Sequence, residues 1–296
     1  MVETSTKSAA SRNKRRLQLV LGLTGLYLVA EVVGGILTHS LALLADAGHM
    51  LTDVGGLALA LLAIRFAERP PSPGRTFGYY RAEILAALAN AVVLVVVSLY
   101  ILYEAYQRFR NPPAVQSGAM LAVATIGLGV NVAGALILRG AASESLNMKG
   151  AFFEVLSDLL TSVGVIVAGI VMLTTGWYYA DPLISAGIGL FILPRTWRLL
   201  RESTAILLEG APPDIDLAAL RQAIAALPGV AGVHDLHAWT LTSGMNALSV
   251  HVVLGTGAAL GDVLRVVHAR VTRDFNIAHA TVQVEPPGWE LGETHL

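Results

Sequence analysis

The chain contains no cysteine, so disulfides and thiolate metal sites are excluded, and any bound metal must be held by His, Asp, Glu or water. Charged residues make up only 14% of the 296, and the formal net charge is -1, which excludes the basic surface expected of a nucleic-acid-binding protein. An HExxH pair and a nucleophile constellation are also missing, so the sequence predicts no enzyme. Because 54% of the residues are hydrophobic, we predict an integral membrane protein.

The apolar residues fall into segments of membrane-spanning length. Six stretches approach the ~20 residues needed to cross a bilayer: 17–38, 41–66, 83–106, 117–138, 150–173 and 181–200. Lys and Arg concentrate in alternate connections, and the positive-inside rule then places both termini in the cytoplasm. We therefore predict a basic cytoplasmic tail over 1–16 and a transport domain of six transmembrane helices over 17–207.

The composition changes from about residue 208. A Pro-Pro pair is followed by a helical pattern, two strands around Ser243-Gly244, an amphipathic helix and a third strand. The order αββαβ predicts a small cytoplasmic α+β domain over 208–288, metallochaperone-like, with a short tail over 289–296. About 80 residues make only a thin core, so dimerisation is expected to stabilise this domain.

Two of the predicted spans carry pairs of polar groups that lipid rejects. His49 and Asp53 lie four residues apart on the second span, and Glu154 and Asp158 have the same spacing on the fifth. Residues at this spacing share a helix face, so the two faces packed together would form a four-ligand pocket for a divalent cation such as zinc, cobalt or manganese. The alternative is that each group makes a hydrogen bond between helices. Burying four of them costs roughly 2.5 to 3.5 kcal/mol each, which favours an ion site.

Three further polar residues lie in predicted spans. Asp46, one turn before His49, either orients the imidazole, lines an entry route or caps a helix. Glu31 and Asn90 are interpreted as interhelical hydrogen-bond partners.

The motifs together resemble the cation diffusion facilitators, nearest the cobalt-zinc-cadmium resistance type. The resemblance covers about residues 14 to 288 and rests on "SLALLADAGHMLTD", "FGYYRAEILAALAN", "FEVLSD", "VHDLHAWTLTSG" and "HATVQVE". It implies a homodimeric antiporter in the bacterial inner membrane that exports a divalent metal in exchange for protons, without a prosthetic group. Metal ions, protons, lipid and a second copy of the chain are then its partners. A membrane-anchored metal sensor or scaffold is the alternative.

The resemblance implies a transport site made by His49, Asp53, Glu154 and Asp158, and here the chain departs from its nearest relatives. They usually have His where this chain has Glu154. Three carboxylates and one imidazole leave an excess of one negative charge over a dication, so either a carboxylate stays protonated or a nearby cation compensates. Carboxylate oxygen also makes the ligand set harder. Zinc is the first expectation, with cobalt, cadmium, manganese and ferrous iron open.

The resemblance also implies a second metal site and a charge interlock outside the membrane. The cytoplasmic site would consist of His234, His251, His279 and Glu285, with Asp235 and His237 beside the first of them. Arg81 and Glu209 would form the interlock between the start of the third span and the end of the sixth.

Overall fold

The computed structural model describes residues 9–67, 72–139, 146–242 and 244–289, except for the side chains of 9–17, 53, 56–67 and 146–151. The chain divides into two compact units. The first comprises Met1–Leu61 and Ala89–Leu199, and the second comprises Leu62–Leu88 and Leu200–Leu296. The second unit therefore contains short ends of three long helices as well as the C-terminal elements.

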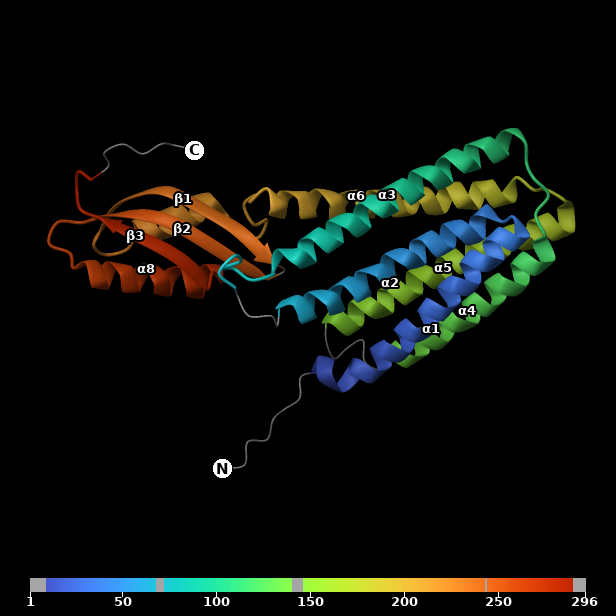
Figure 1. Ribbon diagram of the computed structural model, residues 1–296, viewed down its shortest axis with the longest axis horizontal. Helices are drawn as coiled ribbons and strands as arrows, with labels where there is room; N and C mark the ends of the chain where they lie inside the picture. Colours follow the sequence, from blue (N-terminus) through green and yellow to red (C-terminus); the bar gives the residue numbers. More distant parts are fainter. Residues whose placement is uncertain (1–8, 68–71, 140–145, 243, 290–296) are drawn as a thin grey trace, which may run out of the picture. The chain divides into compact units, whose positions relative to one another are not determined.

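Six long helices run through the first unit and its boundaries (Figure 1). They are α1 (Ala9–Thr38), α2 (Leu41–Ala67), α3 (Arg81–Arg110), α4 (Ser117–Arg139), α5 (Leu146–Thr175) and α6 (Ala180–Leu207). A helix satisfies its backbone hydrogen bonds internally, which apolar surroundings require. Among the described residues, five helices are long and apolar enough to cross a membrane, and α2 contributes a shorter apolar stretch, Leu41–Thr52.

The outward surface of this unit is apolar. Large side chains such as Leu26, Leu136 and Leu160 are each at least 65% exposed, on α1, α4 and α5. Exposed leucines on this scale are expected of a surface that faces lipid. The prediction of an integral membrane protein is therefore supported by both helix length and surface chemistry.

Small residues set the helix spacing inside the unit. A Cβ at Gly34 of α1 would lie 2.9 Å from Val123 of α4, so these helices approach closely only because residue 34 is glycine. Gly48 on α2 faces Val97 of α3, where an added Cβ would lie 3.3 Å from its side chain. Gly48 thus makes room for α3.

Asp181, the second residue of α6, caps the start of α2. Its carboxylate accepts hydrogen bonds from the main-chain N–H groups of Leu41 at 2.9 Å and Ala42 at 3.1 Å, and from Ser40 Oγ at 2.7 Å. Arg108 of α3 pairs with the same carboxylate at 3.4 Å. The first N–H groups of a helix have no partner within it, so a buried helix start needs such acceptors. The start of α2 is thereby tied to α6 and α3.

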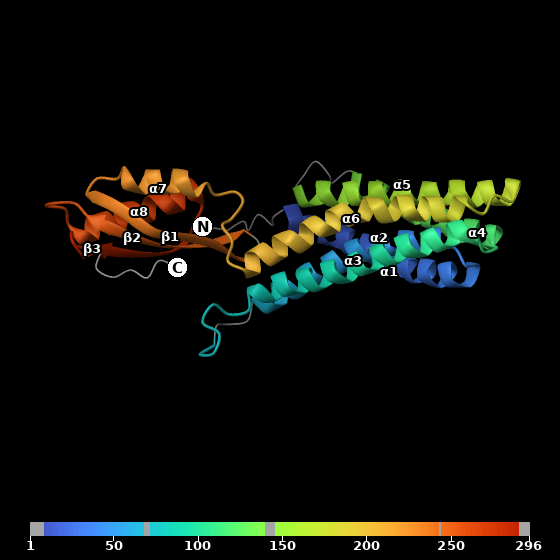
Figure 2. The ribbon, with the colours of Figure 1, turned by 90° about the horizontal axis from the view of Figure 1, so that it is seen from above.

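The C-terminal elements form a three-stranded sheet with two helices on one face (Figure 2). They are α7 (Leu217–Ala225), β1 (Val230–Thr242), β2 (Met245–Leu254), α8 (Leu260–Phe275) and β3 (His279–Glu285), and the strand order is β1-β2-β3. β1 and β2 are antiparallel, whereas β2 and β3 are parallel. A parallel pair needs a crossover, and α8 supplies it.

The core of this unit lies between the helices and the sheet. Val263, Val267 and Val271 recur every four residues along α8 and are all at most 2% exposed. They pack with Leu220 and Ile224 of α7 against the inner side chains of β2. The opposite face of the sheet carries polar side chains such as Ser249 and His251 of β2 and Gln283 of β3.

Candidate metal sites

His49 and Asp158 meet across the α2–α5 interface. His49 Nε2 lies 3.8 Å from Asp158 Oδ1, and both side chains are 3% exposed. This distance exceeds a hydrogen bond. Two donors on one tetrahedral zinc ion, each about 2.1 Å from it, are separated by about 3.4 Å. The pair is therefore spaced more like two ligands of one cation than like a hydrogen-bonded couple.

The two other predicted ligands belong to the same helices. Asp53 continues α2 one turn beyond His49, and its side chain lies outside the described residues. Glu154 is on α5 one turn before Asp158 and is 33% exposed. Its Oε1 accepts a hydrogen bond from Arg195 Nη2 of α6 at 2.6 Å.

Arg195 is a residue that the sequence did not single out. The excess negative charge of three carboxylates and one imidazole called for a nearby cation, and α6 carries Arg195, Arg198 and Arg201 near its end. Only helix packing decides which of them reaches Glu154. Pro194 directly precedes the arginine inside α6, and it removes one N–H donor from the helix at this point.

A cavity of about 230 Å³ adjoins His49. Thr52 of α2 and Phe191, Arg195 and Arg198 of α6 contribute to its wall. The Phe191 ring meets the His49 imidazole edge-on, with centroids 5.8 Å apart. The imidazole is thus held by packing while one side of it faces an open space large enough for a hydrated ion.

Asp46 does not cap a helix. It is 1% exposed, and its carboxylate accepts hydrogen bonds from Thr161 Oγ1 at 2.5 Å and Ser162 Oγ at 3.3 Å, both on α5. Glu31 is also buried, at 0% exposure, and accepts from Tyr27 at 2.9 Å. Both acidic groups lie inside the helix bundle, but the donor to Glu31 belongs to its own helix, so this hydrogen bond is not the interhelical one that was predicted.

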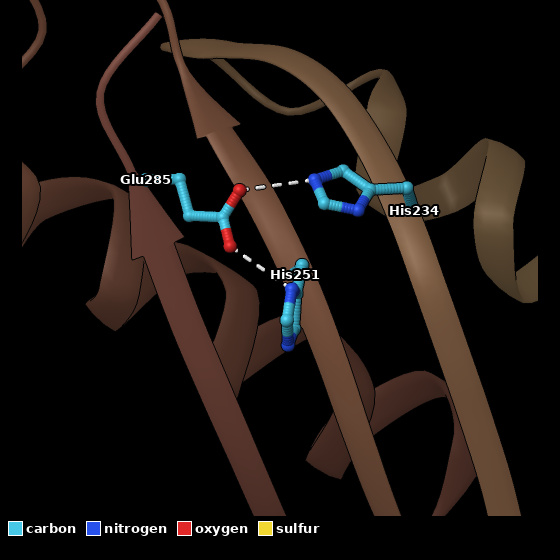
Figure 3. A group of neighbouring side chains, drawn as sticks. All are labelled: His234, His251 and Glu285. Carbon is cyan, nitrogen blue, oxygen red and sulfur yellow. Dashed lines mark hydrogen bonds and ion pairs between the residues drawn. The ribbon is translucent and has the colours of Figure 1, made fainter. Parts of the chain in front are cut away.

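A cluster on the polar face of the sheet gathers three of the four residues predicted for the cytoplasmic site (Figure 3). His234 of β1 pairs with His251 of β2 in the sheet register, and Glu285 ends β3. Glu285 Oε2 lies 3.1 Å from His234 Nε2, and its Oε1 lies 2.9 Å from His251 Nδ1. One ligand atom from each residue falls within 4.8 Å of the others. Two imidazoles and a carboxylate are a donor set that suits a zinc ion.

A β-bulge places Asp235 beside this cluster. The register shifts between His234 and His237, and Asp235 adopts a left-handed backbone with φ of 48°. Its carboxylate lies 2.9 Å from His237 Nε2 and 3.7 Å from His251 Nε2. The hydrogen bond with His237, with help from the charges of the neighbouring histidines, lowers the pKa of Asp235. The bulge therefore adds a charged carboxylate next to the imidazoles.

The structure does not bring His279 into the cluster, which corrects the predicted set. In the β2–β3 register His279 pairs with Ala247, whereas His251 pairs with Gln283. His279 therefore lies six residues before Glu285, roughly 20 Å along an extended strand. Its ring instead contacts Phe77, with centroids 5.5 Å apart. Strand register, which the sequence pattern left open, separates His279 from the other histidine rings.

Arg81 and Glu209 form an ion pair. Arg81 Nη2 lies 2.8 Å from Glu209 Oε1, with side chains 36% and 62% exposed. Glu209 follows the last turn of α6 in a left-handed conformation, with φ of 59°, and the Gly210 N–H donates to Ala205 at 2.8 Å. The contact predicted for the interlock is thus present, although exposed pairs contribute at most about 1 kcal/mol.

Two family models match the chain in succession. The model of the cation efflux transmembrane domain matches residues 17–208, and that of the cation efflux protein cytoplasmic domain matches residues 212–287.

Curated relatives match over nearly the whole length. The metal cation efflux system protein CzcD of Cupriavidus metallidurans is 52% identical over 274 residues, which cover 92% of this chain and 87% of that protein. The cadmium, cobalt and zinc/H(+)-K(+) antiporter of Bacillus subtilis is 41% identical, covering 92% and 89%. The zinc transporter ZitB of Escherichia coli is 41% identical, covering 99% and 94%.

Proposed function

The chain belongs to the cation diffusion facilitator family of metal efflux transporters, and from this premise we propose that it exports Zn2+ from the cytoplasm in exchange for protons. Cobalt, cadmium, manganese and ferrous iron are the other candidate substrates. The names of its relatives refer to zinc, cobalt and cadmium, and one of them to antiport with H+. The proposal includes six membrane spans, cytoplasmic termini and a homodimer.

One observation carries the choice of transport site: the buried pair His49 and Asp158. Each side chain is only 3% exposed, and their facing atoms are 3.8 Å apart. Two facing ligand atoms at this separation can bind one divalent cation between them. We assign Asp53 and Glu154, one turn away on the same helices, as the remaining ligands.

The Glu154–Arg195 ion pair supports a way to balance the charge of this site. The total charge of three carboxylates is -3, which leaves one negative charge when a dication is bound. The Arg195 guanidinium supplies one positive charge, with its Nη2 atom 2.6 Å from Glu154 Oε1. Arg195 also competes with the metal for the same oxygen. In our proposal Arg195 balances the negative charge of Glu154, and Glu154 is the weakest of the four ligands, after His49, Asp53 and Asp158.

Proton exchange follows from the chemistry of these ligands. Metal and protons compete for the same lone pairs, so metal binding from one side displaces protons and protonation from the other side displaces metal. The imidazole nitrogen of His49 and the carboxylate oxygens of Asp53 and Asp158 can each hold either a proton or the metal, so these ligands are suited to this exchange. Alternate opening of the bundle to the two sides of the membrane would then make transport an antiport.

The cluster of His234, His251 and Glu285 is proposed as a cytoplasmic metal site distinct from the transport site. Without metal, Glu285 accepts hydrogen bonds from both imidazoles, so the three side chains are already held together. Metal would replace those shared protons. We propose that this site reports cytoplasmic metal to the dimer, while the helices carry out transport.

Purified protein in liposomes with an imposed pH gradient tests the proposal. We expect Zn2+ uptake in the parent protein and a loss of at least about 100-fold with Asp158→Asn, because a ligand is removed and even residues behind a ligand affect affinity 10- to 100-fold. Asp262→Asn, the same change at an exposed position on α8, is the control and should transport normally. Equal transport by parent and Asp158→Asn, or none by the parent for any candidate metal, would refute the proposal.

A further inference from the structure

A buried acidic pair lies near the proposed transport site but has no role in the mechanism described above. Glu31 on α1 and Asp46 on α2 are 0% and 1% exposed. Their carboxyl groups are within hydrogen-bonding reach of each other. Two neighbouring carboxylates repel each other strongly where water is excluded, so such a pair needs donors or a proton.

The protein builds a specific place for Glu31. Tyr27, one turn earlier on α1 and 3% exposed, donates its hydroxyl hydrogen to Glu31 Oε1 at 2.9 Å. Residue 127 of α4 makes room for this hydroxyl, because a Cβ at Gly127 would lie only 2.0 Å from the tyrosine oxygen. A glycine on one helix is thus required for a hydrogen bond to an acid on another.

Asp46 is held by α5. Its two oxygens accept from Thr161 and Ser162, and Asn131 of α4 donates to Ser162 Oγ at 3.1 Å. All the hydrogen bonds described for the two acids come from hydroxyl groups, and none comes from Lys or Arg. The neutral donors leave the charge of the pair uncompensated.

The second oxygen of Glu31 indicates how this charge is reduced. Glu31 Oε2 is buried and receives no hydrogen bond from a described donor. One proton shared with Asp46 would supply that hydrogen bond and reduce the charge of the pair to a single negative charge. Buried carboxyl pairs in other proteins share a proton for the same reason.

We propose that Glu31 and Asp46 form a proton-binding site, separate from the metal ligands, that loses its proton when metal binds. The inference rests on the proposed antiport. Asp46 precedes His49 by one turn of α2, and the Thr161 hydroxyl that donates to Asp46 also lies 2.9 Å from the main-chain oxygen of Asp158. A dication bound by these two helices repels a proton held one turn away.

Other titratable groups lie on the helices packed around the pair. They are Tyr27 on α1, His49 and Asp53 on α2, and Glu154 and Asp158 on α5. The metal ligands exchange their own protons with metal, so the test must count the protons of the pair separately from theirs.

Isothermal titration of Zn2+ into the purified full-length protein, repeated in buffers of different ionisation enthalpy, counts the protons released per metal ion. We expect Glu31→Gln to bind Zn2+ but to release about one proton fewer than the parent, with a correspondingly weaker pH dependence of Kd. Glu31→Asp should restore the release, and Glu104→Gln, the same change on α3 outside the pair, should leave it unchanged. Equal release by Glu31→Gln and the parent would overturn the proposal.

Infrared difference spectra provide a second measurement that does not depend on transport. Adding Zn2+ to the parent should bleach a protonated-carboxyl band that Glu31→Gln lacks. Tyr27→Phe, which keeps both acids and removes the hydroxyl that donates to Glu31, should retain the band at a shifted frequency. A parent band that zinc leaves unchanged would overturn the proposal even if Glu31→Gln does not fold. A parent that binds no metal would instead refute the proposed transport function.

Discussion

The polar groups of the two units are stabilised in different ways. In the helix bundle, Asp46, Asp158 and Asp181 are at most 2% exposed, and protein groups take the place of water around them. In the sheet cluster, His234 and His251 remain 22% and 24% exposed, so water still reaches them. A substitution in the bundle should therefore affect stability and transport together, whereas one on the sheet should mainly affect metal affinity.

The largest effect on stability is expected at Asp181. Asp181→Ala removes the acceptor for two main-chain N–H groups at the start of α2 and leaves Arg108 without its buried partner. Loss of one member of a buried pair costs about 3 to 5 kcal/mol, and we expect the lower end because Arg108 is 14% exposed. Thermal unfolding in detergent measures the change. Asp181→Asn, which keeps an acceptor oxygen, should lose less, and equal losses would contradict the capping role.

A double-mutant cycle on Glu154 and Arg195 tests the charge balance. Arg195→Gln should reduce Zn2+ transport by up to about fivefold in the parent, because the Arg195 and Glu154 side chains are 52% and 33% exposed and such a pair contributes at most about 1 kcal/mol. In the Glu154→His variant, Arg195→Gln should have little effect on transport, because the third carboxylate is gone.

Competition among zinc, cobalt, cadmium, manganese and iron for transport tests the metal preference. Glu154→His should lower manganese in the order of preferred metals, because an imidazole replaces a carboxylate.

Two results would count against this balance. Additive losses in the cycle would mean that Arg195 acts independently of Glu154. The same metal ranking for the parent and Glu154→His would mean that Glu154 does not harden the site.

A smaller effect on transport is expected at the sheet cluster. Glu285→Gln removes the carboxylate that joins His234 and His251, so metal binding by the cytoplasmic unit should weaken 10-fold or more. Transport at saturating metal should change less than threefold, an order-of-magnitude estimate, because the ligands in the helices are intact. Radioactive zinc binding and liposome uptake separate the two effects. Complete loss of transport would contradict the proposal that the cytoplasmic metal site is distinct from the transport site.

The smallest effect is expected at an exposed pair on α8. The pKa of Asp274 is lowered by its hydrogen bond with Arg273 and by the nearby Arg270. A lowered folded-state pKa adds stability above the ordinary aspartate value of about 3.9, and this stability is lost as the pH falls through the lowered pKa. Asp274→Asn should therefore slightly lower Tm at pH 7 and leave it unchanged in acid. A larger drop in acid than at pH 7 would show that this sign is wrong.

Much of the secondary structure of this protein could be predicted from the periodicity of its sequence. The spacing of His49 and Asp53, and of Glu154 and Asp158, depends only on the helical period, and the apolar run lengths depend only on bilayer thickness. The strands and helices of the C-terminal unit follow from alternation and turn residues in the same way. Geometry within a single helix or strand can be predicted without knowing its tertiary contacts.

The membrane class, the family motifs and the helix face that carries the proposed ligands can be read from the sequence alone, because these are properties of single segments. The packed structure was needed to show that Arg195 pairs with Glu154, that Asp46 lies beside Glu31, and that His279 lies away from Glu285. Each of these facts depends on the rotation of one helix against another or on the register of two strands. Many sequences with the same periodicity allow several such arrangements, and only the packing of all the side chains together selects one of them.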